Sequence, residues 1–454
     1  MSISSIVQEQ RRFFDAGSTR SYNFRKTALL SLRKSILANG ALIEDALKKD
    51  LGKAATEIYM TETGMVLEEI SFHLKHLKHW MKDKTVPTPL SQFHGKSIIS
   101  PEPHGVALIM SPWNYPLQLC LAPVVGAISG GNCVVVKPSA YAANTSHAIA
   151  KILGDAFNPE HIAVIEGGRS ENSALLDEKF DYIFFTGSVS VGKIVMAAAS
   201  KNLTPVTLEL GGKSPCIIDE TANIKLAARR AAFGKVLNGG QTCVAPDYLF
   251  VHKSVKSAFI DAFKAALDEF FPNGDLTEMP SIINDKHFER VSGLMKGEKV
   301  VCGGRTDPTK RLIEATLLDD VSPDAPVMQE EIFGPVFPIM PFSDISKCID
   351  YIKKNPKPLA LYLFTNSKKT EQQVLNNCSF GGGCINDTII HLASSQLSFG
   401  GVGDSGMGEY HGKASFDTFS HKRSIIKKFN WIDLPMRYHP YSKIKLNLIR
   451  MFLK

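Results

Sequence analysis

The sequence predicts an α/β protein with two lobes, each built on a mostly parallel sheet that is covered by helices. Three observations support this prediction. Residues 1–82 place apolar side chains at helical spacing, as in YNFRKTALLSLRKSILANGALIEDALKKDL. Strand-like runs such as GVALIM, CVVVKPS and YIFFTG then alternate with helical stretches. A second set of alternations begins near PVTLELGGKSPCIID and continues to about residue 390.

The bulk composition is that of a soluble globular protein. The chain has 454 residues, of which 44% are hydrophobic and 21% charged, and this length suggests two or three domains. The N-terminus has no apolar run of the secretory type, so we expect a cytoplasmic protein. Residues 117–136 form the most apolar stretch, but Pro123 and Gly126 interrupt it, and a buried helix followed by a strand fits it better than a membrane span.

The eight cysteines are scattered, with no CxxC motif and no histidine pair at metal-ligand spacing. We therefore expect reduced thiols, no disulfide framework and no metal site. Seven of the eight are expected to be small core residues. Cys243 stands apart because it lies in a polar, glycine-rich break, NGGQTCVAPDY, between a helical stretch and a strand. Packing, metal ligation, half of a disulfide and nucleophilic chemistry all remain open for it at this point.

The positive charge is concentrated at the C-terminal end. The net charge is +7, and residues 421–454 contain nine Lys or Arg against the single acid Asp433, so the rest of the chain is close to neutral. The body thus has no basic excess that would indicate a nucleic-acid partner. The tail YSKIKLNLIRMFLK mixes apolar and basic residues; it could contact an anionic membrane surface weakly, or it could be a packed or frayed terminus.

A glycine-rich turn lies between a strand and a helix in YIFFTGSVSVGKI. Such a turn can bind phosphate through main-chain N–H groups, or it can be a tight turn and nothing more. Gly187, Gly192 and Lys193 match the P-loop pattern, but Ile194 stands where a Mg²⁺-binding hydroxyl is required. The dinucleotide pattern G-x-G-x-x-G fails at Val189.

Three further polar residues lie at predicted strand ends, where open parallel sheets bind ligands. Lys137 could bind a ribose or a phosphate, or it could be a solvated surface lysine. Glu209, between two leucines, could be a general base with a raised pKa or a salt-bridged structural residue. Asn114, in SPWNYP, could donate to an oxyanion or cap a turn.

Taken together, MSPWNYP, VVVKPS, FTGSVSVGK, LELGGKSP, NGGQTC and EEIFGPV resemble the ordered motif set of the NAD(P)-dependent aldehyde dehydrogenases. The short N-terminus and the ending SFGGVGDSGMGEYHGKASFDTFSHKRS resemble the class 3, or fatty-aldehyde, branch. The resemblance covers essentially the whole chain, and six motifs in the same order make it highly specific.

The resemblance implies a role for each motif. Cys243 would attack the aldehyde as a thiolate, Asn114 and the Cys243 N–H would hold the oxyanion, and Glu209 would activate the water that releases the acid. The cofactor would be NAD or NADP. The residues implied in binding it are Trp113, Lys137, Gly187, Ser188, Gly192, Glu331 and Phe333. Without the family context, Glu331 could equally be a surface acid.

One position departs from the pattern in a way that bears on the cofactor. Many relatives carry an acid three residues after the lysine, where this chain has Ala140. A carboxylate there repels a 2′-phosphate and alanine does not, so we expect NADP to be accepted.

The resemblance also implies a division of the chain. The expected parts are a Rossmann-like cofactor-binding domain (1–82 and 100–209), an α/β catalytic domain (210–390), a small β bridging or oligomerisation element (83–99 and 410–435) and a basic tail (436–454). A homodimer is expected. Aromatic residues such as Tyr115 and Phe399 favour medium- or long-chain or aromatic aldehydes over sugars. Two alternatives are a CoA-acylating enzyme, disfavoured by Glu209, and a non-catalytic protein that retains the fold.

Overall fold

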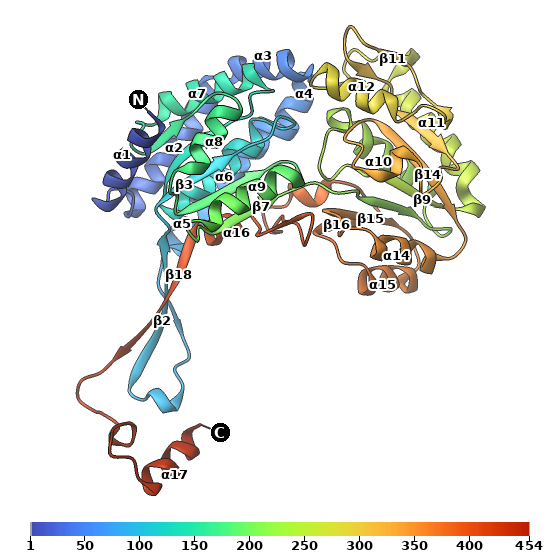
Figure 1. The fold of residues 1–454 in the computed structure, drawn as a ribbon. Helices are drawn as coiled ribbons and strands as arrows, with labels where there is room; N and C mark the ends of the chain where they lie inside the picture. Colours follow the sequence, from blue (N-terminus) through green and yellow to red (C-terminus); the bar gives the residue numbers. More distant parts are fainter. Residues whose placement is uncertain (1, 454) are drawn as a thin grey trace.

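The N-terminal segment is helical, as its apolar spacing predicts. The computed structural model describes residues 2–453 (Figure 1). Ser21 begins the second helix by accepting a hydrogen bond from the Phe24 N–H at 3.1 Å, and Gly52 ends the third with a φ of +68°. The helices are α1 (Ile3–Asp15), α2 (Tyr22–Ala38), α3 (Gly40–Leu51), α4 (Ala55–Ile58) and α5 (Gly64–Trp80).

A six-stranded sheet forms the centre of the first lobe. Its strand order is β17-β7-β6-β3-β4-β5, and all neighbours are parallel except the β17–β7 pair. Helices cover both faces, which is why strands such as VALIM and CVVVK are apolar throughout. The strands are β3 (Val106–Met110), β4 (Cys133–Lys137), β5 (Ile162–Val164), β6 (Tyr182–Thr186), β7 (Val206–Glu209) and β17 (Gly406–Met407).

The second lobe is built on a seven-stranded sheet in the order β10-β13-β14-β9-β8-β15-β16. Within this sheet of the described residues, only the edge pair β10–β13 is antiparallel; β11 (Thr306–Asp307) and β12 (Leu312–Ile313) form a separate antiparallel pair. The strands are β8 (Pro215–Ile218), β9 (Tyr248–His252), β10 (Lys299–Cys302), β13 (Thr316–Asp319), β14 (Val336–Phe342), β15 (Ala360–Phe364) and β16 (Gly382–Ile385).

The remaining helices follow the two sheets in chain order. The prediction for residues 117–136 is confirmed, because a fully buried helix leads there into β4. The first lobe adds α6 (Gln118–Gly130), α7 (Ala143–Ala156), α8 (Arg169–Asp177), α9 (Val189–Ser200) and α16 (Lys413–Thr418). The second adds α10 (Ile224–Val236), α11 (Lys256–Phe270), α12 (Asp285–Gly293), α13 (Pro326–Gln329), α14 (Ile345–Lys354) and α15 (Lys368–Asn377).

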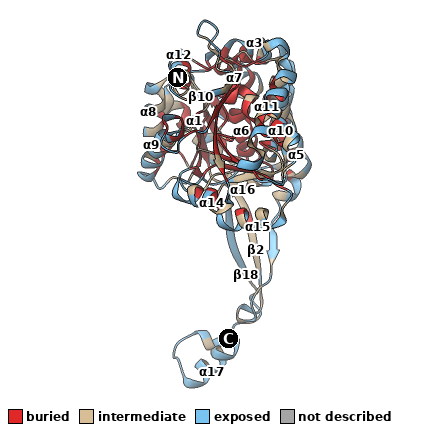
Figure 2. Ribbon diagram, turned by 90° about the vertical axis from the view of Figure 1, so that its right-hand side faces the viewer, coloured by how far each residue is buried: buried red, intermediate tan, exposed pale blue. Residues whose placement is uncertain are grey.

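A narrow stalk projects from the first lobe (Figure 1). It is a three-stranded antiparallel sheet of β1 (Lys84–Val86), β2 (Gly95–Pro103) and β18 (Ser420–Lys428), and it continues into the C-terminal helix α17 (Lys443–Phe452). Figure 2 shows the buried core confined to the body, whereas the stalk is mostly intermediate or exposed. Residues 84–86 form a strand because they pair with β2.

The eight cysteines are all free, and five of them are buried. Cys302 and Cys384 are only half-buried, so the expectation that seven cysteines lie in the core is wrong for these two. Both lie on strands near an edge of the second sheet, where side chains have fewer neighbours. Within residues 2–453, no helix is both long and apolar enough to cross a membrane.

Asn132 joins three parts of the first lobe, and its loss is expected to destabilise the fold. Its buried side chain accepts from the Gly105 N–H at 3.0 Å and donates to the Phe419 carbonyl at 2.8 Å. Asn132→Ala would leave both groups buried without a partner, at about 1–3 kcal/mol each. We expect a lower midpoint of urea unfolding, while the exposed Asn377→Ala, a matched control, leaves it unchanged. Equal midpoints for the two variants would contradict the prediction.

Candidate active site

Several of the predicted site residues lie along one edge of the first sheet. Trp113 and Asn114 follow β3, Lys137 ends β4, Gly187 follows β6 and Glu209 ends β7. These four strands run parallel, so their carboxyl ends meet at the same edge. This is the edge at which open α/β sheets bind ligands.

Asn114 connects this edge to the loop that carries Cys243. Its buried side-chain amide donates to the carbonyl of Gln241 at 3.0 Å. Its main-chain carbonyl accepts from the side-chain amides of Asn238 at 2.8 Å and from Lys53 Nζ at 3.2 Å. Two amide hydrogen bonds thus cross between the lobes, and the second N–H of the Asn114 amide stays available to a ligand.

The loop before Cys243 is held in an unusual main-chain conformation. Asn238 and Gly239 both have positive φ, +52° and +60°. The Gln241 side chain locks the loop, since it donates to the carbonyls of Asn238 and Ser281 at 3.0 Å and accepts from the Ile283 N–H at 3.0 Å. A strained main-chain conformation that is held by several hydrogen bonds, as here, is typical of functional loops.

Cys243 itself is half-buried. Burial raises the pKa of its thiol well above the ordinary value, and the charges of Glu331 and Glu209 raise it further. The main-chain N–H groups of Cys243 and Val244 oppose this rise in pKa. The thiol is therefore protonated at neutral pH in this structure, and its reaction requires a group that removes the proton.

Glu209 is buried, and neither of its carboxylate oxygens has a hydrogen-bond partner within the described residues. Burial raises the pKa of this carboxyl well above its usual range, and the nearby charge of Glu409 adds to the effect. The salt-bridged alternative is therefore wrong for Glu209 here. An unpaired acid with a raised pKa at a strand end can act as a general base near neutral pH.

The residues predicted to bind a dinucleotide lie around the start of α9 and the end of β4. Ser188 caps α9, and its oxygen accepts from the Val191 N–H at 3.4 Å. A Cβ at Gly192 would lie 2.7 Å from the Leu210 side chain, so glycine permits close approach of helix and sheet. Lys137 is buried, not solvated, and its ammonium donates to the carbonyls of Pro138 and Gly167 at 2.8 and 2.7 Å. These features fit a phosphate at the helix N-terminus with a ribose nearby.

Glu331 and Phe333 lie on a loop of the second lobe that faces this edge. The Glu331 carboxylate packs against Gly211, where a Cβ would collide with it. Burial raises the pKa of Glu331 to about 8. Trp113 and Phe333 pack edge to face, with ring centroids 5.3 Å apart. Arg290 holds the loop by donating to the carbonyl of Ile332 at 2.6 Å.

A cavity of about 190 Å³ opens onto Cys243, and its lining is almost entirely apolar. Tyr115 and Phe399, the two aromatic residues singled out from the sequence, both line it. The sequence did not point to most of its walls. Those residues are Met60, Thr61, Met65, Gln118, Leu119, Phe233, Leu237, Thr242, Ile389, Ile390, Leu392, Ala393, Tyr410 and His411.

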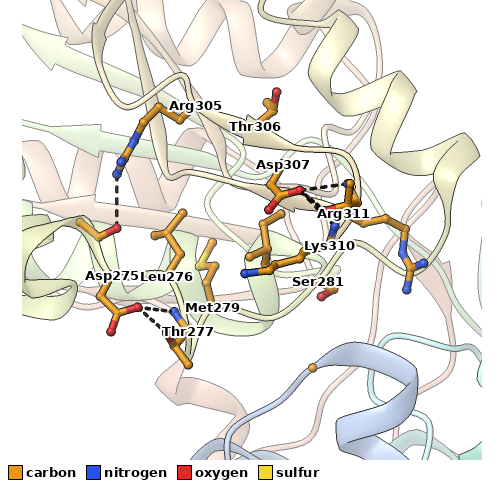
Figure 3. A pocket seen from close by; sticks show the side chains of 14 residues that line it. Asp275, Leu276, Thr277, Met279, Ser281, Arg305, Thr306, Asp307, Lys310 and Arg311 are labelled. Atoms are coloured by element: carbon orange, nitrogen blue, oxygen red, sulfur yellow. Dashed lines mark hydrogen bonds between the residues drawn. The ribbon is translucent and has the colours of Figure 1, made fainter.

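A larger hollow of about 610 Å³ lies elsewhere on the second lobe (Figure 3). None of the predicted site residues lines it. Most of its charged groups are already bonded: Arg305 donates to the Gly274 carbonyl, and Asp275 and Asp307 accept from Thr277 and Thr309. Within the described residues, its lining contains no cysteine, unlike that of the cavity at Cys243.

Comparison with known proteins agrees with this geometry. A model of the aldehyde dehydrogenase family matches residues 1–425. The chain is 48% identical to the 4,4'-diaponeurosporen-aldehyde dehydrogenase of Staphylococcus aureus, across 100% of this chain and 99% of that protein. It is 44% identical to the rat aldehyde dehydrogenase described as dimeric and NADP-preferring, across 94% and 95% of the two chains.

A solved structure shows the same fold. The substrate-bound state of Staphylococcus aureus AldH superposes with a TM-score of 0.98 at 46% identity, and each chain is covered completely. Further relatives that carry the family 3 designation are 43–45% identical. The chain therefore belongs to the aldehyde dehydrogenase family, in its class 3 branch, and oxidises aldehydes to carboxylic acids with NAD or NADP.

Proposed function

We propose that Cys243 is the nucleophile of this oxidation and that its substrates are apolar aldehydes of medium or long chain, or aromatic aldehydes. The observation that carries the proposal is the position of the Cys243 thiol at the wall of an apolar cavity, two residues after the carbonyl that Asn114 binds. An apolar cavity favours alkyl and aryl groups because it gains free energy by burying them. Turnover that does not increase with aldehyde chain length would contradict the substrate proposal.

The chemistry is assigned to this chain's own residues. Sγ of Cys243 bonds to the carbonyl carbon as a water molecule takes the thiol proton and passes it to solvent, and the oxyanion is held by the free N–H of Asn114 and the main-chain N–H of Cys243. NAD(P)⁺, when bound, accepts the hydride from that carbon. A thioester then remains on Cys243. Glu209 takes a proton from the water that attacks the thioester. The carboxylic acid is then released, and Glu209 returns the proton to the Cys243 sulfur.

We assign the cofactor to the first lobe, with the dinucleotide along Lys137, Gly187, Ser188 and Gly192. Trp113, Glu331 and Phe333 would hold the nicotinamide riboside. Ala140 is exposed and adds no negative charge beside a 2′-phosphate, which supports use of NADP as well as NAD. A lower kcat/KM for NADP in an Ala140→Glu variant, with kcat/KM for NAD unchanged, supports this assignment, whereas an unchanged kcat/KM for NADP, or strict NAD dependence of the unaltered enzyme, overturns it.

We propose that the stalk forms a homodimer interface in a cytoplasmic enzyme. The three-stranded stalk sheet is largely exposed on both faces, including Ile425 and Ile426 at 38% and 50%, and such a small sheet gains stability when a second copy covers it. The same reasoning makes residues 83–99 and 410–435 the bridging element, beside the cofactor-binding and catalytic domains proposed above.

We propose weak peripheral contact with anionic membranes through the tail. The helix α17 exposes Ile444 and Met451, at 74% and 68%, together with the basic Lys443, Lys445 and Arg450. An amphipathic basic helix of this kind can lie on an anionic surface, with its apolar side chains in the interface.

Removing the thiol is expected to abolish oxidation, and removing the base is expected to stall it after hydride transfer. Cys243→Ser should lower turnover by about 10³-fold or more, because a hydroxyl is a far weaker nucleophile at neutral pH. Glu209→Gln should give a single burst of reduced cofactor and then slow turnover, because the thioester no longer meets an activated water. Stopped-flow absorbance of reduced cofactor measures both.

Two results would contradict this assignment. Unchanged turnover of Cys243→Ser would show that Cys243 is not the nucleophile. Unchanged steady-state turnover of Glu209→Gln would show that Glu209 is not the general base. A steady-state rate that appears only with added coenzyme A would indicate the CoA-acylating enzyme instead, since the thioester would then leave by thiol exchange.

The pH dependence follows from the two raised pKa values. Both Cys243 and Glu209 react in their deprotonated forms, so turnover should rise with increasing pH. The effect on stability has the opposite sign. The protonated Glu209 carboxyl stabilises the fold fully below its ordinary pKa, and this contribution is lost as the pH rises through the raised pKa of the folded protein. The thermal midpoint of Glu209→Gln should therefore exceed that of the unaltered enzyme by more as the pH rises above the ordinary carboxyl pKa. A difference that does not change with pH would contradict the raised pKa.

Deleting residues 436–454 should separate the two surface proposals. Light scattering should still give a dimer, because the stalk strands end before the deletion, whereas co-sedimentation with phosphatidylserine vesicles should fall. A monomeric full-length protein would overturn the dimer, and equal co-sedimentation of the two proteins would overturn the membrane contact.

A further inference from the structure

A fully buried ion pair lies behind the Asn114 loop. Lys53 Nζ is 2.6 Å from Oε1 of Glu62, and both side chains have no exposed surface. Moving two charges out of water is unfavourable, and an ion pair repays it only when further hydrogen bonds satisfy the remaining atoms. Such a pair contributes little to the net free energy of folding. The contacts that it makes with neighbouring residues therefore bear on its role.

Glu62 fastens the pair to the start of α6. Its second carboxylate oxygen accepts from the main-chain N–H groups of Leu117 and Gln118 at 3.1 and 2.9 Å. A carboxylate at a helix N-terminus satisfies unpaired N–H groups and interacts favourably with the helix dipole. Glu62 lies in a π-helical turn, Tyr59–Thr63, a distortion that is frequent at functional sites.

Lys53 fastens the pair to the two residues that contact the nucleophile loop. Its ammonium donates to the Asn114 carbonyl at 3.2 Å and lies 4.1 Å from the centre of the Tyr115 ring. The Asn114 side chain is bonded to the carbonyl of Gln241, and the Tyr115 hydroxyl is 2.7 Å from Oγ1 of Thr242. The ammonium thus touches two consecutive residues that in turn reach the two residues before Cys243.

We propose that Lys53, held by Glu62, is a positioning residue for aldehyde oxidation, because it fixes the main chain of Asn114 so that the Asn114 amide points at the developing oxyanion. This inference rests on the roles proposed above for Asn114 and Cys243. Lys53 donates to the carbonyl of Asn114, and the Asn114 amide donates to the carbonyl of Gln241, so the residue is fixed at both ends. Oxyanion donors act through geometry, since they must lie within about 2.7–3.1 Å of the oxygen in the transition state.

The alternative is that the pair only holds the N-terminal helical segment against the Asn114 loop. Asn238 also donates to the Asn114 carbonyl, at 2.8 Å, so the loop keeps one anchor when Lys53 is lost. A merely structural pair would change the stability of the protein and would lower turnover by the same factor whether or not the Asn114 amide is present.

A double-mutant cycle between Lys53 and Asn114 distinguishes the two. Asn114→Ala alone should lower kcat by about 100-fold, as the loss of one oxyanion donor does. Lys53→Met alone should lower kcat by about 10-fold, with the KM for the cofactor unchanged. In the Asn114→Ala background, Lys53→Met should lower kcat by less than about twofold, because its effect passes through the missing amide. Factors that multiply independently would overturn the proposal.

Three further variants keep the test decisive. Lys53→Arg should restore most of the activity, because it keeps a donor and a positive charge at this place. Lys256→Met, a matched control, breaks the ion pair with Asp319 at 2.9 Å in the second lobe and should leave kcat unchanged. If Lys53→Met does not fold, the neutral pair Lys53→Met/Glu62→Gln takes its place in the same cycle, with the same expected factors.

The failure of this inference differs from a failure of the proposed function. If Cys243→Ser or Asn114→Ala keeps full turnover, the proposed function fails and Lys53 has nothing to position. If both of these variants lose turnover while Lys53→Met behaves like Lys256→Met, the proposed function stands and the positioning role of Lys53 is wrong.

Discussion

The hydrogen bonds that Asn114 makes across the seam between the lobes set the geometry of the site. The residue belongs to the loop after β3, yet its amide binds the carbonyl of Gln241, two residues before Cys243 in the other lobe. Its own carbonyl is bound by Asn238 of that lobe and by Lys53 of the first. Because these groups are buried, each lost partner would leave a polar atom without a hydrogen bond. The hydrogen bonds therefore fix the position of one lobe relative to the other.

The same burial controls the chemistry of the ionisable groups. The pKa values of Cys243, Glu209 and Glu331 are all raised, first by burial and then by neighbouring negative charges. Each of these three groups therefore favours its protonated form more strongly than it would in water.

Apolar side chains are also exposed outside the body of the molecule, on the stalk and on α17. Cys243 opens onto an apolar cavity inside the molecule, whereas the stalk and α17 carry apolar and basic side chains far from the sheets (Figure 1). Apolar surface of this extent on a thin projection is stabilised only by being covered. Family membership determines the reaction, whereas the proposals on substrate, dimer and membrane contact rest on the cavity, the stalk and α17.

The sequence by itself determined the alternating elements and the local motifs, because strand ends, glycine turns and caps depend on residues close in the chain. It placed Asn114, Lys137, Glu209 and Cys243 at element boundaries, where the structure also has them. Only the tertiary structure decided that Lys137 and Glu209 are buried and that Lys53 and Glu62 pair behind Asn114. Those features depend on contacts between segments far apart in the chain, for which neither periodicity nor composition carries a signal.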